Sequence, residues 1–269
     1  MSHYWTWDGS PELLRIGAFS IRWYGAFFAL GFYLGLRVLN RLAKMDRLEP
    51  PQFDSMLTPV IAGTVIGARL GHVFFYEPSV FLEDPIRILK VWEGGLASHG
   101  GTLGVALAVY LWKRKHYAGT LLSLLDRLAV PSAMVAGMIR LGNFFNSEIL
   151  GRASDLPWAI VFKRVDEVPR HPAMLYEALS YFGIFAVLMG VVNRGVHRRF
   201  GDGFLLGIFF MSLFTARFLI EFCKEIQVPS EAGLPLDLGQ ILSLPFVIMG
   251  GFLVVRSVRK RSGVSKASS

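Results

Sequence analysis

The sequence predicts an all-α protein that crosses a membrane about seven times. Of its 269 residues, 53% are hydrophobic and 18% are charged, whereas soluble proteins carry roughly 25% charged residues. Apolar runs close to the ~20 residues needed to cross a bilayer recur along the chain, and its mean hydropathy is +0.45. The basic residues fall in alternate loops, which is the charge pattern of a polytopic membrane protein.

Seven spans are expected, near residues 18–38, 56–76, 96–112, 121–145, 174–193, 203–223 and 238–256. The third span is short. The fourth contains Pro131, which neighbouring helices can accommodate inside a membrane.

The loops after the first, third and fifth spans and the C-terminal tail are basic, whereas the other loops mix both signs. The basic residues are Arg37, Arg41, Lys44, Arg47, Lys113, Arg114, Lys115, Arg194, Arg198, Arg199, Arg256, Arg259, Lys260, Arg261 and Lys266. The positive-inside rule therefore predicts that the N-terminus faces outward, which is the periplasmic side in a bacterial inner membrane, and that the C-terminus is cytoplasmic. The net charge of +8 is then mainly a topology signal, and it gives no reason to invoke nucleic acid.

Residues 1–258 are expected to form a single membrane-embedded domain, with residues 259–269 as a polar cytoplasmic tail. The segment 147–171 is too polar for the membrane and is expected to form a small periplasmic element. The N-terminus lacks a basic n-region and a cleavage site, so we expect no removable signal peptide, and "HYWTW" is typical of an interfacial aromatic anchor.

Cofactor and metal chemistry find no support in the sequence. Cys223 is the only cysteine, which excludes an intramolecular disulfide and a cysteine-based metal cluster. No metal-ligand spacing, phosphate loop or dinucleotide fingerprint occurs. Ser98 and His99 are sequence neighbours without a glycine-framed serine elbow. We therefore expect no metal and no cofactor.

Polar side chains recur at the outer end of every predicted span. They are Tyr24, Arg69, His72, His99, Arg140, Asn143, Asn146, His171, Tyr176, Glu177, Arg217, Glu221 and Gln240. An ionisable group within a membrane costs about 2.5–3.5 kcal/mol on insertion scales and usually lines a functional cavity. A single arginine near a helix end can instead extend to the interface. Three arginines on the side opposite the positive-inside bias favour a polar cavity open to the outer leaflet.

The stretch "IRLGNFFNSEILGR" (139–152) concentrates hydrogen-bonding groups directly after an apolar run. Arginine is permanently charged, and its donors match phosphate and carboxylate oxygens. Together with the asparagine amides, this indicates a site for an anionic phospholipid headgroup. Internal pairing is the alternative: Arg217 and Glu221 stand at i and i+4, and Arg140 and Glu148 can pair likewise. A surplus of positive charge remains in either case.

In "LASHGGTLGV" (96–105), His99 precedes Gly100 and Gly101, with Gly104 one turn further on. Histidine is suited to moving protons near neutral pH, although it also serves as a structural hydrogen-bonding residue. Glycines allow a ligand or another backbone to approach closely. Three classes of function stay open at this point: a lipid-transferring enzyme, a transporter or flippase for an anionic lipid or solute, and a scaffolding protein. A transporter needs polar groups on both sides of the midplane, whereas these crowd one side.

The segment "GMIRLGNFFNSEILGR" (137–152) resembles the signature of the bacterial phosphatidylglycerol–prolipoprotein diacylglyceryl transferases. "SHGG" at 98–101 is similar to the His-Gly-Gly segment of that family. Further segments resemble the family in the expected order: "IRWYG" at 21–25, "GARLGHVFFY" at 67–76, "HPAMLYE" at 171–177, "RFLIEF" at 217–222 and "GQILSLP" at 239–245. The resemblance covers nearly the whole chain.

The resemblance implies a seven-span inner-membrane transferase of lipoprotein biosynthesis, with residues 1–258 as its catalytic domain and its active site towards the periplasm. Such an enzyme moves a diacylglyceryl group from phosphatidylglycerol to the lipobox cysteine thiol of a prolipoprotein. The products are a thioether and glycerol-1-phosphate.

Residue roles follow from the same resemblance. Arg140 and Arg217 would bind the phosphate, and Asn143 and Asn146 would orient the headgroup. Glu148 and Gly151 complete the signature, Glu221 accompanies its arginine, and Tyr24 matches a tyrosine of the site. His99 is the candidate for taking the thiol proton, because the thiolate is the nucleophile. Two positions depart from the family pattern. Met174 stands where glutamine is frequent, and Lys224 stands where several relatives have arginine, which puts a third phosphate contact there in doubt.

Overall fold

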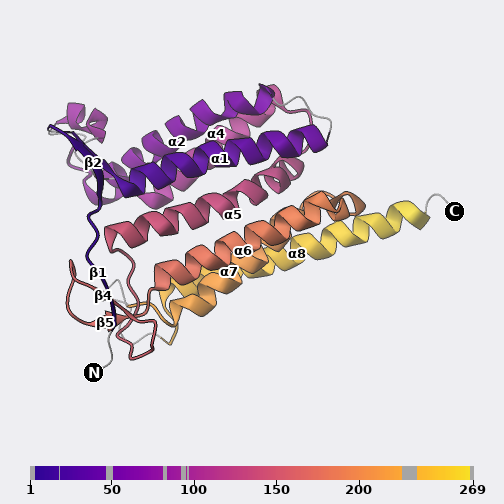
Figure 1. Ribbon diagram of the computed structural model, residues 1–269. Helices are drawn as coiled ribbons and strands as arrows, with labels where there is room; N and C mark the ends of the chain where they lie inside the picture. The colour runs from indigo at the N-terminus through magenta and orange to yellow at the C-terminus, as the bar shows by residue number, and fades with distance from the viewer. Residues whose placement is uncertain are drawn as a thin grey trace. The chain divides into compact units, whose positions relative to one another are not determined.

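The computed structural model describes residues 4–17, 19–46, 51–80, 84–91, 95, 97–225 and 235–266 (Figure 1). Within these residues it contains seven long α-helices, which confirms the predicted all-α membrane class. They are α1 (Trp23–Met45), α2 (Pro51–Tyr76), α4 (Ser98–His116), α5 (Leu121–Asn146), α6 (Ala173–Asn193), α7 (Phe204–Glu221) and α8 (Leu238–Lys266). Each predicted span overlaps one of these helices.

Six of the seven helices are long and apolar enough to cross a membrane; α4 is the exception. Its 19 residues end in Lys113, Arg114, Lys115 and His116, so its hydropathy falls below that of the others. The third predicted span, called short from the sequence, therefore exists as a helix with a strongly basic end.

The first span begins later than predicted. It was expected from residue 18, but Phe19–Arg22 form strand β3, which pairs antiparallel with β2 (Glu12–Ile16), and α1 starts only at Trp23. Apolar residues fit a strand as well as a helix, so hydropathy does not separate the two. At the other end of the chain, α8 runs past residue 256 and takes in residues 259–266 of the predicted tail.

The chain divides into two compact units. The smaller unit comprises residues 40–124 and is built on α2 and α4, which lie side by side. Gly63 and Gly67 of α2 face Gly104 and Gly100 of α4. A methyl group on Gly63 would meet the Gly104 carbonyl oxygen at 2.6 Å, so side chains cannot be accommodated along this seam. The glycines of α4 therefore allow the backbone of α2 to approach closely. Small residues allow close helix packing of this kind in membranes.

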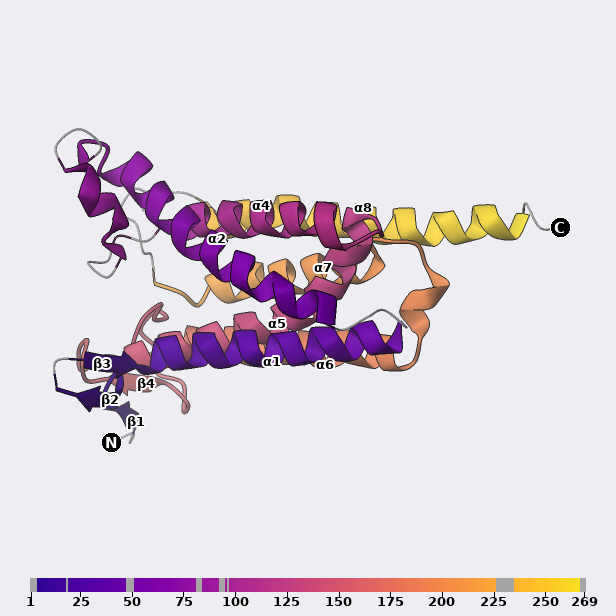
Figure 2. The ribbon, with the colours of Figure 1, turned by 90° about the horizontal axis from the view of Figure 1, so that it is seen from above.

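The larger unit comprises residues 1–39 and 125–269, with α5, α6, α7, α8 and the first part of α1. Gly31 of α1 packs against Met138 of α5, and Gly137 of α5 lies against the ring of Phe182 on α6. The helices α7 and α8 run side by side in both views (Figure 2).

Asp126 of α5 caps the N-terminus of α7. The Gly203 and Leu206 amides donate hydrogen bonds of 2.7 and 2.8 Å to its two carboxylate oxygens. A helix N-terminus leaves amide donors unsatisfied and favours negative charge. Asp126 therefore joins α5 to α7 at the helix end opposite the site described below.

A small β element lies beside the C-terminal end of α5. Strand β1 (Trp5–Trp7) pairs in parallel with β4 (Ile160–Phe162), which pairs antiparallel with β5 (Pro169–Arg170). A hydrophobic cluster, to which Phe144 and Phe162 belong and against which Trp7 packs, joins this element to α5. The polar segment 147–171 thus forms a compact cover over the end of α5 where the family signature lies.

Candidate active site

A buried network of charges joins α5, α6 and the end of α7 within the larger unit. The Glu177 side chain is 0% exposed, and its Oε2 lies 2.9 Å from Arg140 Nε. Its Oε1 accepts hydrogen bonds from Lys224 Nζ at 3.0 Å and from the Tyr181 hydroxyl at 3.2 Å. Lys224 Nζ also donates to Glu221 Oε2 at 2.9 Å. Buried charges are tolerated when paired in this way, so the network fixes the position of each member.

A second chain of hydrogen bonds runs along the signature. Arg140 Nη1 donates to Asn143 Oδ1 at 3.3 Å, and Asn143 Nδ2 donates to Glu148 Oε2 at 3.0 Å. Asn146 Nδ2 donates to the other Glu148 oxygen at 3.1 Å. The buried Asn146 Oδ1 accepts no hydrogen bond within the described residues. Glu148 therefore orients both carboxamides, and among the described residues Asn146 Oδ1 remains available as an acceptor.

The turn that carries Glu148 has a strained backbone. Ser147 and Ile149 adopt φ values of +55° and +60°, a region that a β-branched residue such as Ile149 rarely occupies. Such strain costs of order 1–3 kcal/mol and concentrates at functional sites. The Glu148 amide donates to the Asn143 carbonyl at 2.9 Å, which closes the turn.

Arg217 differs from the other cations of the site. In the described part of the chain it forms no ion pair and no side-chain hydrogen bond. The predicted alternative, pairing of Arg217 with Glu221, is wrong, because Glu221 is bound by Lys224 instead. Arg140 and Glu148 do not pair directly either, since Asn143 stands between them.

Tyr24 lies at the start of α1 against the signature helix. A methyl group on Gly142 of α5 would meet the Tyr24 ring at 3.0 Å, so the glycine admits the tyrosine. Its hydroxyl is close enough to interact electrostatically with Glu148 and Arg140. The structure therefore brings together Tyr24, Arg140, Asn143, Asn146 and Glu148, all of which belong to the predicted site.

Gly151 has a packing role in this structure. Its amide donates to the His171 carbonyl at 3.0 Å, and a methyl group there would meet the His171 and Cys223 carbonyl oxygens at 2.5 and 2.7 Å. The next residue, Arg152, donates from Nε to the Lys224 carbonyl at 2.9 Å. Gly151 thus holds the signature against the segment that follows α7.

Outside the helices, Arg170 stabilises the β element through two acidic partners. Its Nη2 lies 2.5 Å from Asp166 Oδ2, and its Nη1 lies 3.0 Å from Glu225 Oε2. The hydrogen bond from Arg170 holds the pKa of Asp166 below its usual range, and the bond to Asp166 raises the pKa of Arg170 in turn.

Arg69, in the smaller unit, serves a structural purpose that differs from the predicted one. It is 4% exposed, and it donates hydrogen bonds to the carbonyls of Ile88 at 3.0 Å, Arg87 at 2.5 Å and Gly95 at 3.3 Å. These carbonyls belong to the segment around the short 3₁₀ helix η1 (Pro85–Leu89). The guanidinium therefore holds this segment against α2, and the expectation that Arg69 lines the polar cavity is not supported.

His99 also lies in the smaller unit, on the first turn of α4. It is exposed, and its ring contacts those of Phe75 and Tyr76 at centroid distances of 5.1 and 6.1 Å. Arg140 and Arg217 belong to the larger unit.

Sequence reasoning gave Glu177, Lys224 and Tyr181 no role in the site. Glu177 was recognised only as one of many polar groups, and Lys224 only as a departure from the family pattern. The available signal was the presence of a glutamate and a lysine inside or beside apolar helices, where an unpaired charge is costly. Which residues pair with which requires the fold, because Glu177 and Lys224 are 47 positions apart.

Among the residues that the structure describes, Arg217 has no ion-pair partner and Arg140 uses Nε for Glu177, so both guanidinium groups can contribute donors to an anion. The carboxylates of Glu177 and Glu221 are engaged by Lys224, and the Glu148 carboxylate is engaged by the two asparagines. Such a site can bind a phosphate and stabilise negative charge that develops on it.

Comparison with known proteins agrees with this chemistry. The family model described as "Prolipoprotein diacylglyceryl transferase" matches residues 11–256. A protein of Tolumonas auensis named phosphatidylglycerol–prolipoprotein diacylglyceryl transferase is 46% identical over 256 residues, covering 95% of this chain and 98% of the relative. Proteins of the same name from Chloroherpeton thalassium and Porphyromonas gingivalis are 47% and 44% identical, and these matches cover at least 94% of each chain. The chain therefore belongs to the prolipoprotein diacylglyceryl transferase family.

Proposed function

We propose that this transferase moves the diacylglyceryl group of phosphatidylglycerol to the lipobox cysteine thiol of a prolipoprotein. The cysteine sulfur forms a thioether bond to the terminal carbon of the diacylated glycerol. The bond between that carbon and the phosphate oxygen breaks, and glycerol-1-phosphate leaves. The reaction is the first step of lipoprotein maturation. The name of the relatives states both substrates. The observation that carries the proposal is Arg217, an arginine on a membrane helix whose neighbouring carboxylate, Glu221, is bound by Lys224.

Arg217 and Arg140 bind the phosphate in this proposal. Negative charge gathers on the departing phosphate in the transition state, and preorganised donors there are worth several kcal/mol. The ion pair of Arg140 Nε with Glu177 fixes that guanidinium, and its Nη1 donates to Asn143. In the proposal, the outer nitrogens of Arg140 donate to the phosphate. Arg217 needs no rearrangement to accept the phosphate, because it has no ion-pair partner to leave within the described residues.

The asparagines and Glu148 orient the glycerol headgroup. Glu148 accepts from Asn143 and Asn146, so the position of both carboxamides is set before the lipid arrives. Asn146 Oδ1 is buried and has no hydrogen-bond donor within the described residues. A hydroxyl of the phosphatidylglycerol headgroup can supply that donor, and a buried acceptor left unpaired costs about 1–3 kcal/mol.

His99 is proposed to take the proton of the lipobox thiol. A free thiol near pKa 8.5 is mostly protonated at neutral pH, whereas the thiolate is the reactive form. The imidazole of His99 is exposed on the first turn of α4 and packs on Phe75, so it is accessible to a peptide. Tyr24 is proposed to contact the headgroup beside Glu148, Glu221 to hold Lys224 away from it, and Gly151 to support the signature backbone.

The site is proposed to face the periplasm, with the protein in the inner membrane. Support comes from the basic residues at the opposite ends of the helices, such as Lys113 to Lys115 at the end of α4 and Arg256 and Arg259 on α8. By the positive-inside rule those ends are cytoplasmic. The β element would then lie on the periplasmic side of the membrane.

The direct test uses purified protein in detergent micelles with phosphatidylglycerol and a synthetic lipobox peptide, followed by mass spectrometry. The peptide should gain the mass of one diacylglyceryl group, and glycerol phosphate should appear in equal amount. A peptide with serine in place of cysteine should stay unmodified, because the hydroxyl is not ionised near neutral pH. Movement of the lipid between leaflets without any covalent product would indicate a transporter and would contradict the proposal.

A further inference from the structure

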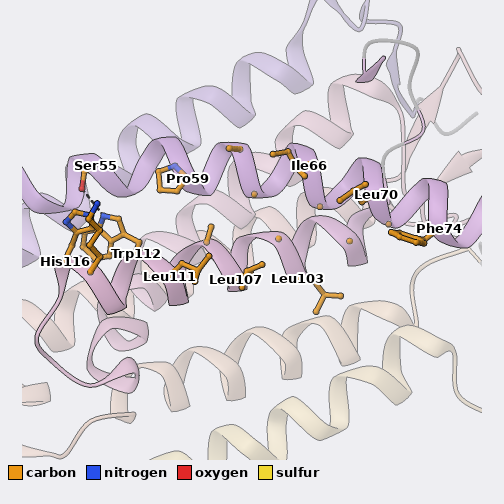
Figure 3. Close-up of a pocket in the computed structure, with 18 of the residues that line it drawn as sticks. Ser55, Pro59, Ile66, Leu70, Phe74, Leu103, Leu107, Leu111, Trp112 and His116 are labelled. Carbon is orange, nitrogen blue, oxygen red and sulfur yellow. Dashed lines mark hydrogen bonds between the residues drawn. The ribbon is translucent and has the colours of Figure 1, made fainter. Parts of the chain in front are cut away.

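An apolar groove runs along α2 and α4 within the smaller unit. Its volume is about 750 Å³, and side chains from both helices line it (Figure 3). The floor is formed by the glycine seam, where Gly63, Gly67 and Gly104 offer no side chain. The walls carry exposed apolar residues, among them Ile66 and Leu107.

One end of the groove is closed by a tryptophan and carries basic side chains. The buried Trp112 closes it and donates from Nε1 to Ser55 Oγ at 2.9 Å. The His116 ring stacks on Trp112 at a centroid distance of 5.5 Å, and Lys115 lies beside it, exposed. The other end is lined by Phe74 and Phe75.

The polarity of the groove is one-sided. Lys115 and His116 are the residues with titratable side chains among those that line it, and none of the lining residues, all of which the structure describes, is acidic. The helix rises about 1.5 Å per residue, so the groove follows α2 for about 30 Å, roughly the thickness of the hydrocarbon core. The shape and charge fit a molecule with a long apolar part and an anionic end.

We propose that this groove binds one anionic phospholipid of the cytoplasmic leaflet, with its phosphate at Lys115 and an acyl chain along α4 past Leu111 and Leu107. The basic end of α4 is cytoplasmic by the positive-inside rule, so the headgroup meets the surface where anionic lipid attracts basic residues. This lipid differs from the substrate lipid of the proposed reaction, whose headgroup would lie at the opposite membrane face. The inference does not depend on the transfer chemistry.

A signal-peptide helix is the competing occupant, and charge disfavours it. A signal peptide begins with a basic n-region that stays on the cytoplasmic side. In this groove that n-region would lie against Lys115, where like charges repel.

Photocrosslinking in nanodiscs tests the proposal. The protein is placed in phosphatidylcholine discs that contain either a diazirine-bearing phosphatidylserine or a phosphatidylcholine with the same chains. The diazirine stands near the glycerol in one probe and near the methyl end in another. From Lys115 to Leu103, α4 extends about 18 Å, comparable to an acyl chain. The glycerol-side probe should label residues 111–116, and the methyl-end probe should label residues 103–107.

Phosphatidylserine should label the groove about fivefold more than phosphatidylcholine, from the interaction of one basic residue with an anionic headgroup. Lys115→Gln should remove this difference. Arg114→Gln is the matched control, because Arg114 is a neighbouring exposed cation that does not line the groove, and it should retain the preference. Thermal unfolding midpoints of both variants verify folding.

Three outcomes would overturn the proposal. Equal labelling by the two lipids would remove the anionic preference, and a reversed order of the two probes would place the headgroup at Phe74. Displacement of the lipid by a signal peptide with a basic n-region would assign the groove to the precursor.

Discussion

At the scale of single residues, the cations of the site differ in what holds them. Arg140 and Lys224 share the buried Glu177, whereas Arg217 has no ion-pair partner within the described residues. Removing one partner of a buried pair costs about 3–5 kcal/mol, because the other charge stays buried. Substitution of Arg140 should therefore affect both folding and the proposed transfer, whereas substitution of Arg217 should affect the transfer alone.

Lys224→Met tests the proposed function of the lysine. Glu177 and Glu221 lose their shared cation, so the free energy of unfolding should fall by roughly 3–5 kcal/mol. The freed Glu221 can then pair with Arg217 at i+4, which should lower kcat/KM beyond the effect of stability. Thermal unfolding and the transfer assay in micelles measure the two effects.

The double variant Lys224→Met/Glu221→Gln provides the control for that effect. It removes the carboxylate that competes for Arg217, so kcat/KM should recover part of the loss. Lys224→Arg retains the positive charge and should keep most of the activity. If the double variant is no more active than Lys224→Met, Lys224 does not act through Arg217.

Asp166 should give the β element an acid-dependent stability. Arg170 lowers the pKa of Asp166 below the value of about 3.9 in an unfolded chain. The contribution is therefore complete above about pH 5, and it is lost as the pH falls below about 4 and through the folded pKa. The Val168 amide donates to Asp166 at 3.0 Å, so its hydrogen-exchange protection factor should decline over that range. Asp166→Asn should lower the protection at neutral pH and abolish the acid step.

At the scale of elements, the membrane-spanning helices could be predicted from the sequence, whereas their ends could not. A span needs about 20 apolar residues, which hydropathy detects directly. The β2–β3 hairpin was missed because Phe19–Arg22 directly precedes the apolar run of α1, and its pairing with Glu12–Ile16 depends on register. The C-terminal end of α4 was predicted at residue 112, because the basic last turn lowers the hydropathy. The helix continues to His116.

The glycine seam between α2 and α4 gives a prediction for Gly67→Ala. Its methyl group would meet the Gly104 Cα at 2.9 Å and the Gly100 carbonyl, so the helices must separate. Overpacking of this kind costs about 1–3 kcal/mol. Gly183→Ala, in α6, meets nothing within 4 Å and should stabilise the helix by about 0.5–1 kcal/mol. Opposite shifts in the unfolding midpoint in micelles are expected, and a neutral Gly67→Ala would refute the close packing.

At the scale of the whole molecule, the local part of the site was predictable and the distributed part was not. Residues 140–148 fall within three turns of one helix and the bend after it, so the signature places them together. The charge network joins α5, α6 and the end of α7 through contacts between residues far apart in the sequence. The sequence could name its members as polar groups in apolar surroundings, but their pairing depends on how the helices pack.

The orientation in the membrane is tested with single cysteines in a Cys223→Ser background. Glu167→Cys in the β element should react with a membrane-impermeant maleimide applied to spheroplasts, because that element is proposed to be periplasmic. Ala118→Cys, between α4 and α5, should react only after the membrane is permeabilised. Both positions are exposed, so each should be labelled once the reagent has access. Labelling of Ala118→Cys in intact spheroplasts would contradict the proposed topology and indicate the opposite orientation.

The most direct test of the central claim compares the wild-type protein with Arg217→Ala in the diacylglyceryl transfer assay. No ion pair holds Arg217 within the described residues, so the variant should keep the wild-type unfolding midpoint. Its kcat should nevertheless fall by about 10²–10³, the cost of removing one preorganised donor from a developing anion. A folded Arg217→Ala protein that modifies the lipobox peptide at the wild-type rate would contradict the account.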